Sequence, residues 1–172
     1  MSHAAVQPYI EQALALGAAD ALAVTPHDLC FDSRTLLKCM FGCDDWGRNH
    51  SCPSRPANVS LAEYKEMLCR YSHGVLVHTH DKASLQRITL AVEGRAFAEG
   101  YYFAFSLADC GCCAACAGVD GQPCRFPQKA RPALHSVGID VFATVRRLGL
   151  PIHTLTDPAA EEQNWYGLVF IE

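Results

Sequence analysis

Several features that would assign this 172-residue sequence to a common functional class are missing. It has no long basic run, and its 14 Lys and Arg residues are outnumbered by 18 Asp and Glu residues, giving a net charge of −4. Nucleic acids and anionic membranes attract cationic surfaces, so this balance argues against both as partners. The longest apolar stretch, residues 101–108, is far shorter than the roughly 20 residues that cross a bilayer. We therefore expect neither nucleic-acid binding nor a membrane span.

A secretory signal is also missing from the start of the sequence. The first basic residue is Arg34, and the apolar stretch at 13–24 is interrupted by Gly17 and Asp20. A signal peptide would combine an early basic region with an unbroken apolar segment. We therefore expect a cytoplasmic protein, in a compartment that keeps thiols reduced.

Three motifs of common enzyme classes are absent as well. The sequence contains no G-x-S-x-G, no phosphate-binding G-x-x-x-x-G-K-[ST] and no G-x-G-x-x-G. Triad hydrolysis, phosphoryl transfer and dinucleotide binding therefore lack support.

What the sequence does contain is an unusual number of cysteines, ten in 172 residues. Half of the residues are hydrophobic, so the chain can bury a core without the disulfides that stabilise very small secreted domains. Its thiols need another use. Binding of metal is the use that we predict from this excess.

The pattern around the cysteines is typical of an α/β fold. We predict a single metal-binding domain over residues 1–172, with a mixed sheet of about four to five strands, flanking helices and two cysteine-rich loops at about 30–56 and 109–132. Apolar periodicity and capping signals predict helices at 6–19, 60–71, 84–100 and 139–148. Alternating or aromatic runs predict strands at 22–25, 75–79, 101–107 and 165–171.

The second cysteine window has the spacing of an iron–sulfur site. Four of its thiols follow C-x2-C-x2-C-x7-C, formed by Cys110, Cys113, Cys116 and Cys124. Bacterial ferredoxins begin with the same C-x2-C-x2-C, because two-residue spacers let successive sulfurs converge on one cluster. Zinc is the alternative, although zinc modules more often pair two separated C-x2-C units.

Other residues of this window have weaker assignments. Cys112 adjoins Cys113 and cannot easily reach the same metal, so we treat it as a spare thiol. Three basic residues follow the last cysteine and could stabilise a negatively charged cluster, form a solvated turn or attract an acidic partner. They are Arg125, Lys129 and Arg131.

The first window offers three ligands and an open fourth position. Cys39, Cys43 and Cys52 follow C-x3-C-x8-C, and the Cys52–Pro53 pair resembles the end of a ferredoxin motif, whose last cysteine ligates the other cluster. Cys52 and Cys124 could therefore exchange clusters. The remaining candidates for a fourth ligand are a non-protein ligand, a residue of a second copy in a homodimer, or the side chains of Cys30, His50, Asp44 and Asp45. We expect Cys69 to pack in the core instead.

The spacing thus predicts one or two [4Fe–4S] clusters, and close clusters in a small domain predict electron transfer. The sequence does not indicate which redox partner protein would exchange electrons with it. An alternative is a non-redox enzyme, in which an iron bound by only three cysteines acts on a small-molecule substrate. A further alternative is a zinc-stabilised interaction module.

The segments LLKCMFGCDDWGRNHSCPS and CGCCAACAGVDGQPCRFPQKARPALHSVGIDV resemble a cysteine-rich family of predicted metal-binding proteins. This family is a domain of unknown function, found mostly in anaerobic bacteria and archaea. The resemblance extends over about residues 31–150 and implies metal binding by the seven cysteines named above for the two windows. The sequence departs from the family pattern at Ser54, where a second Pro is expected, and at residues 133–135, where Ala-Leu-His replaces Ser-Met-Glu.

Overall fold

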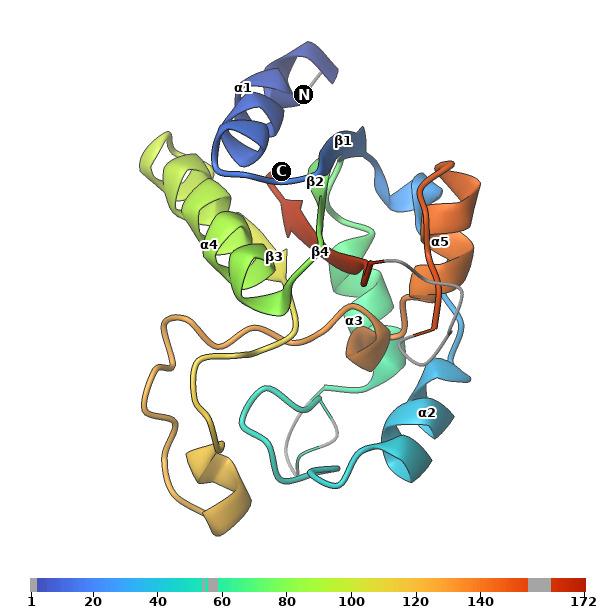
Figure 1. The fold of residues 1–172 in the computed structure, drawn as a ribbon, viewed down its shortest axis with the longest axis vertical. Helices are drawn as coiled ribbons and strands as arrows, with labels where there is room; N and C mark the ends of the chain where they lie inside the picture. Colours follow the sequence, from blue (N-terminus) through green and yellow to red (C-terminus); the bar gives the residue numbers. More distant parts are fainter. Residues whose placement is uncertain (1–2, 54, 56–58, 155–161) are drawn as a thin grey trace.

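In a computed structural model, a four-stranded antiparallel sheet forms the centre of the molecule (Figure 1). The structure describes residues 3–53, 55, 59–154 and 162–172. The strands are β1 (Asp20–Val24), β2 (Gly74–Thr79), β3 (Phe105–Leu107) and β4 (Trp165–Phe170), in the order β1-β2-β4-β3. The predicted α/β class and strand number are confirmed. All strand pairs are antiparallel, however, whereas we expected a mixed sheet.

Helices cover both faces of this sheet. Helices α1 (His3–Ala15) and α4 (Lys82–Ala98) pack on one face, and α3 (Leu61–Leu68) and α5 (Val141–Arg147) lie on the other (Figure 1). Side chains of a strand alternate between the two faces of a sheet. In β2, Val75 and Val77 therefore pack in the core under α1 and α4, and Leu76 packs in the core under α3 and α5. Both faces are therefore buried, which explains why all of β2 is apolar or internally hydrogen-bonded.

The helix boundaries follow capping signals in the sequence. The Ser60 hydroxyl accepts a hydrogen bond from the Glu63 backbone N–H, and the Glu63 carboxylate accepts one from the Ser60 N–H, which forms the predicted capping box of α3. At α4 the cap is Asp81, whose carboxylate accepts from the Ser84 N–H at 2.8 Å. Helix α4 places Ala96 in the core and leaves Phe97 exposed.

Two segments differ from the expected elements. Residues 101–104 form a turn instead of the start of a strand, because the Ala104 N–H bonds the Tyr101 carbonyl and Gly100 takes a positive φ of 101°. In addition, helix α2 (Thr35–Gly42) lies where a loop was expected. It buries none of its residues, and its apolar side chains Leu37, Met40 and Phe41 are exposed.

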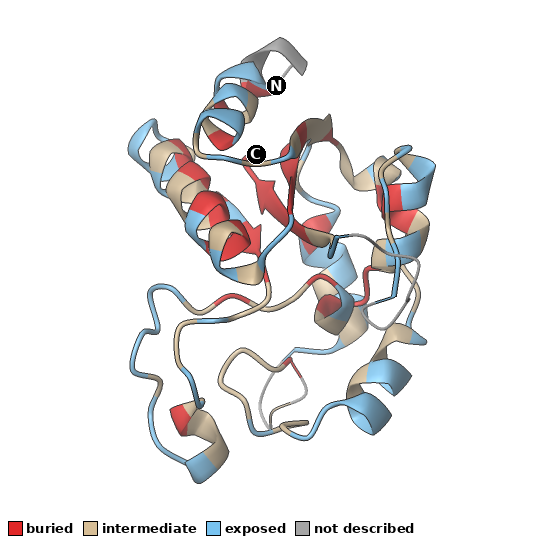
Figure 2. Cartoon of the chain, viewed as in Figure 1, coloured by how far each residue is buried: buried red, intermediate tan, exposed pale blue. Residues whose placement is uncertain are grey.

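The two cysteine windows leave this scaffold at the same end of the molecule (Figure 1). Figure 2 shows that little of this end is buried, in contrast to the sheet and the inner face of α4. Within the described residues, no helix is both long and apolar enough to cross a bilayer.

Candidate metal centre

The second window is held at both ends by side chains of α4. It begins directly after β3, where Lys82 pairs with Asp109 at 2.7 Å. Near its far end, the Arg131 guanidinium donates to the Glu93 carboxylate, with an Nε–Oε2 distance of 2.9 Å. Glu93 also accepts from the backbone N–H and the hydroxyl of Ser106 in β3. Helix α4 therefore fixes the positions at which this loop leaves and rejoins the fold.

Arg131 is buried and paired with Glu93. It is therefore neither part of a solvated turn nor available to an acidic partner, and two of the three roles that we considered for it were wrong. It also stacks over the Phe105 ring at 4.9 Å. Arg125 and Lys129, in contrast, are exposed.

Gln86 of α4 contacts the middle of the same loop. Its side-chain amide donates to the Cys112 Sγ at 3.0 Å and to the Lys129 carbonyl at 3.2 Å, while its oxygen accepts from the Gly111 N–H. Gln86 is itself buried. No sequence motif predicts this contact, because nothing distinguishes this glutamine from others within an amphipathic helix. Gln86 thus orients Cys112 toward the helix.

The protein environment affects the thiols unequally. The pKa of Cys112 is raised mainly by burial, with a further increase from the neighbouring Cys110. The pKa of Cys39 is raised by burial and by the nearby Cys52, Cys43 and Asp109. Metal ligation requires the thiolate. These thiols would therefore need the positive charge of a bound metal to lose their protons at neutral pH.

The first window is compact because of short-range backbone hydrogen bonds. Helix α2 carries Cys39 and ends at Gly42, and the carbonyl of the next residue, Cys43, accepts from the Trp46 N–H. The Cys52 N–H then donates to the Asn49 carbonyl at 3.0 Å. These turns bring the three cysteines of this window into one region. Ser54, one of the departures from the family pattern, lies outside the described residues.

The two windows contact each other at one point. The backbone N–H of His50 donates to the Cys116 Sγ at 3.4 Å. At the same point, a Cβ added to Gly118 would lie 2.8 Å from the Arg48 carbonyl oxygen and 3.0 Å from the His50 nitrogen. Only glycine allows the backbones to approach this closely. His50 and Cys116 are 66 residues apart in the sequence, and the fold brings their loops into contact.

The other candidate ligands have different surroundings. The His50 ring nitrogen Nδ1 lies 2.9 Å from Arg55 Nη1, Asp44 is exposed, and Asp45 pairs weakly with Arg48 at 3.6 Å. Cys30 lies against α5, where its N–H donates to the Thr144 hydroxyl. Cys69 caps the end of α3 and is exposed, so the expectation that it packs in the core was wrong.

The thiols are not converged on a metal position. The ten cysteines are thiols that form no disulfide, and the described part of the chain contains no group of three or more His, Cys, Asp or Glu side chains arranged to hold an ion. The donors nevertheless fit a thiolate-bound metal chemically, because they are reduced, accessible and supported by an N–H donor at one sulfur. Closing the site requires local movement of the loops.

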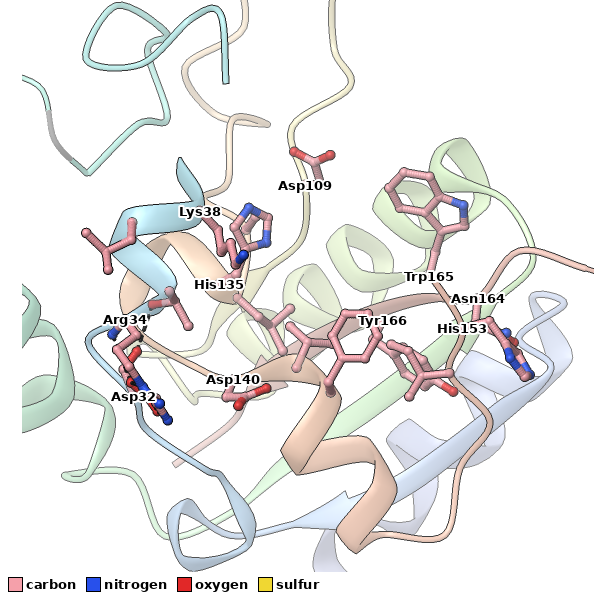
Figure 3. Close-up of a pocket in the computed structure, with 17 residues that line it drawn as sticks. Asp32, Arg34, Lys38, Asp109, His135, Asp140, His153, Asn164, Trp165 and Tyr166 are labelled. Carbon is pink, nitrogen blue, oxygen red and sulfur yellow. Dashed lines mark hydrogen bonds and ion pairs between the residues drawn. The ribbon is translucent and has the colours of Figure 1, made fainter. Parts of the chain in front are cut away.

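A cavity of about 710 Å3 lies beside the two windows (Figure 3). Its wall includes Lys38 and Asp109, which directly precede the first metal-binding cysteine predicted for each window. His135 also lines it, from a short helical turn (His135–Val137) that contacts α2. Burial by the surrounding protein lowers the pKa of His135, against the opposing effect of the Asp109 carboxylate. The sequence did not indicate this cavity.

Comparison with known proteins identifies a family. No curated protein and no solved structure matches the sequence significantly. The family described as "Predicted metal-binding protein (DUF2284)" matches residues 23–171, which include both cysteine windows and all four strands except the beginning of β1. This chain therefore belongs to the DUF2284 family of predicted metal-binding proteins.

Proposed function

We propose that the two cysteine windows bind iron–sulfur clusters of the [4Fe–4S] type and that the protein transfers electrons in the metabolism of an anaerobe. The observation that carries this proposal is the contact between the windows, where the His50 N–H donates to the Cys116 Sγ and Gly118 permits the close approach. Backbone donors to cysteine sulfur are among the factors that set the potential of such clusters. An electron-transfer role benefits from loops that lie together and open to solvent.

The ligands proposed for the first cluster are the four cysteines of C-x2-C-x2-C-x7-C in the second window. Cys39, Cys43 and Cys52 would hold a second cluster, with its fourth ligand open. Because the windows touch, exchange of Cys52 and Cys124 between the clusters is also compatible with the fold. When bound, such a cluster supplies a store for one electron. The chain's own part is to hold the second window through α4 and to donate the His50 N–H to the Cys116 sulfur.

Zinc is a competing occupant, since four thiolates also satisfy a tetrahedral zinc site. The short C-x2-C-x2-C spacing favours the cluster, because two-residue spacers place three sulfurs on one face of a cube. The contact between Cys116 and a backbone N–H supports either metal. Metal identity is therefore the first quantity to measure.

The test is iron, zinc and acid-labile sulfide analysis on protein purified without oxygen, with absorption spectra and voltammetry. The proposal expects about four or eight irons per chain, equal sulfide and a reversible couple. Stoichiometric zinc without sulfide would refute the cluster. A cluster without a reversible couple would refute electron transfer alone.

The cavity beside the windows favours a second candidate, a cluster enzyme whose substrate approaches an iron bound by three cysteines. The observation behind it is that Lys38 and Asp109 belong to the cavity wall and adjoin Cys39 and Cys110. A change in the cluster spectrum when a small ligand is added would favour this role. A spectrum indifferent to every added ligand would exclude it.

A further inference from the structure

The cavity beside the cysteine windows has the size and wall of a small-molecule site. Its volume of about 710 Å3 falls within the range usual for ligand pockets. Apolar side chains from the start of α5 and the segment that follows it, Val141, Phe142 and Ile152, form part of the wall. Trp165 and Tyr166, at the start of β4, line the side of the cavity opposite Asp32 and Arg34 (Figure 3). This surface suits the hydrocarbon part of an organic ligand.

The acidic groups of the wall already have partners. Asp32 accepts from the Arg34 guanidinium at 2.5–3.0 Å, and Asp109 pairs with Lys82 at 2.7 Å. Asp140 caps α5, where its carboxylate accepts from the Ala143 N–H at 2.9 Å. None of these carboxylates therefore calls for a cationic ligand.

The polar groups left over are mainly hydrogen-bond donors. Within the described residues, the ammonium of Lys38 makes no ion pair and the ring of His135 makes no hydrogen bond. At the other end, His78 Nε2 lies 2.8 Å from Asn164 Oδ1, so the Asn164 side chain is hydrogen-bonded to the protein. His78 is itself buried and bound by Asp20 at its other nitrogen, so it fixes the Asn164 amide. The wall thus offers the Lys38 cation to a ligand with an acidic group.

We propose that this cavity binds a small organic carboxylate. Its carboxylate group pairs with Lys38 at the end beside the cysteine windows, and its apolar body lies along Phe142 and Ile152 toward Trp165. The carboxylate is the class favoured because a charged acceptor matches an unpaired ammonium and an apolar body matches the wall. The placement of this ligand next to a redox centre rests on the function proposed above, whereas its binding does not.

The experiment is calorimetric titration of the anaerobically purified protein with a matched pair of probes, 3-phenylpropionate and 3-phenylpropanamide. The two share a body and differ only in charge. We expect the acid to bind about tenfold more tightly, as for a charge-assisted hydrogen bond. The Lys38→Met variant keeps the alkyl stem and should lose most of that preference, leaving amide binding unchanged. The control is Lys129→Met, an exposed lysine of the second window outside this cavity.

Three results would overturn the proposal. They are no binding of the acid up to about 10 mM, equal affinity for acid and amide, or equal losses in the two lysine variants. Because Lys38 is exposed, its substitution leaves the core intact. Iron and sulfide are measured on the same samples, which separates the two proposals. Lys38-dependent binding in a protein that contains zinc, or no metal, would refute the cluster and retain the carboxylate site. A cluster without binding would do the reverse.

Discussion

The backbone amide of His50 donates a hydrogen bond to the sulfur of Cys116, and this single contact joins two cysteine loops that lie far apart in the sequence. Next to it, Gly118 faces the Arg48 carbonyl so closely that no side chain fits between them. The two loops therefore form one region of the molecule. A metal bound in one loop is affected by the position of the other.

Replacement of Gly118 by alanine should separate the loops. The new Cβ would lie 2.8 Å and 3.0 Å from two backbone atoms, which cannot move away as a flexible side chain would. We expect the variant to fold, since the sheet and its cores are elsewhere, but to retain less than about half of the metal of the wild type. Metal analysis with circular dichroism measures both effects.

The matched control is Gly42→Ala, at the end of α2 in the first window. An added Cβ there meets nothing within 4 Å, and the backbone does not have a positive φ. Its metal content should equal that of the wild type. Full metal content in Gly118→Ala would show that contact between the loops is not needed for binding.

A second prediction concerns the adjacent thiols Cys112 and Cys113. Cys112 contacts Gln86 on α4 and has a raised pKa because of burial, so its environment favours the neutral thiol. Cys112→Ser should therefore keep the metal, whereas Cys113→Ser should lose most of it, as expected when one of four thiolates is removed. Metal and sulfide content of the two variants measures the difference. Cys69→Ser, an exposed position away from both windows, provides the baseline.

The opposite order, with metal lost in Cys112→Ser and retained in Cys113→Ser, would show that the ligand spacing was misassigned. Equal losses would mean that the loop needs both thiols. Either result would remove the four-cysteine pattern as the basis for a [4Fe–4S] site.

Local signals in the sequence were enough to predict the scaffold. The capping box of Ser60 and Glu63 and the β-branched run of β2 depend on neighbours in the chain, so they can be recognised without the fold. The clustering of the cysteines in two windows is likewise a property of the sequence. These signals led to the α/β class, the four strands and the family.

What the sequence could not indicate depends on contacts across the fold. The Gln86 contact with the second window and the approach of His50 to Cys116 join residues 25 or more positions apart. Helix α2 has apolar residues at helical spacing, such as Leu37 and Phe41, but they are exposed, and the cysteines of the same segment led us to expect a loop. The cavity follows from the packing of α2, α5 and β4, and no motif marks it.

The buried ion pair between Glu93 and Arg131 leads to a stability prediction. Both side chains are largely buried, and Glu93 also accepts two hydrogen bonds from Ser106. Arg131→Met would leave the carboxylate without its cation, so we expect the free energy of unfolding to fall by about 3 kcal/mol, as when one partner of a buried pair is removed. Urea denaturation at neutral pH measures the change.

The control for this variant is Arg34→Met, which breaks the exposed pair of Arg34 with Asp32. Surface pairs contribute less than about 1 kcal/mol, so this variant should unfold near the wild-type midpoint. Similar unfolding midpoints for the two variants would show that Arg131 does not fasten the second window to α4.

The last prediction concerns pH and His135. Burial lowers the pKa of this imidazole below its ordinary value of 6.5, so between the two values the unfolded chain binds more protons than the folded protein. The stability that depends on neutral His135 is therefore complete above pH 6.5 and is lost as the pH falls toward the lowered pKa. Glutamine at this position keeps a polar side chain and does not titrate. His135→Gln should therefore show a smaller loss of stability between about pH 7.5 and 5.5 than the wild type.

Urea denaturation at the two pH values, applied to both proteins, isolates this effect, because all other histidines are shared. His27→Gln, outside the cavity, supplies a second comparison that tests whether the effect is specific to His135. An equal loss of stability in the wild type and in His135→Gln would mean that the cavity does not hold this imidazole in its neutral form. A larger loss in the wild type would establish that the wall of the cavity disfavours an additional positive charge at His135, which leaves Lys38 as the cation that an acidic ligand meets there.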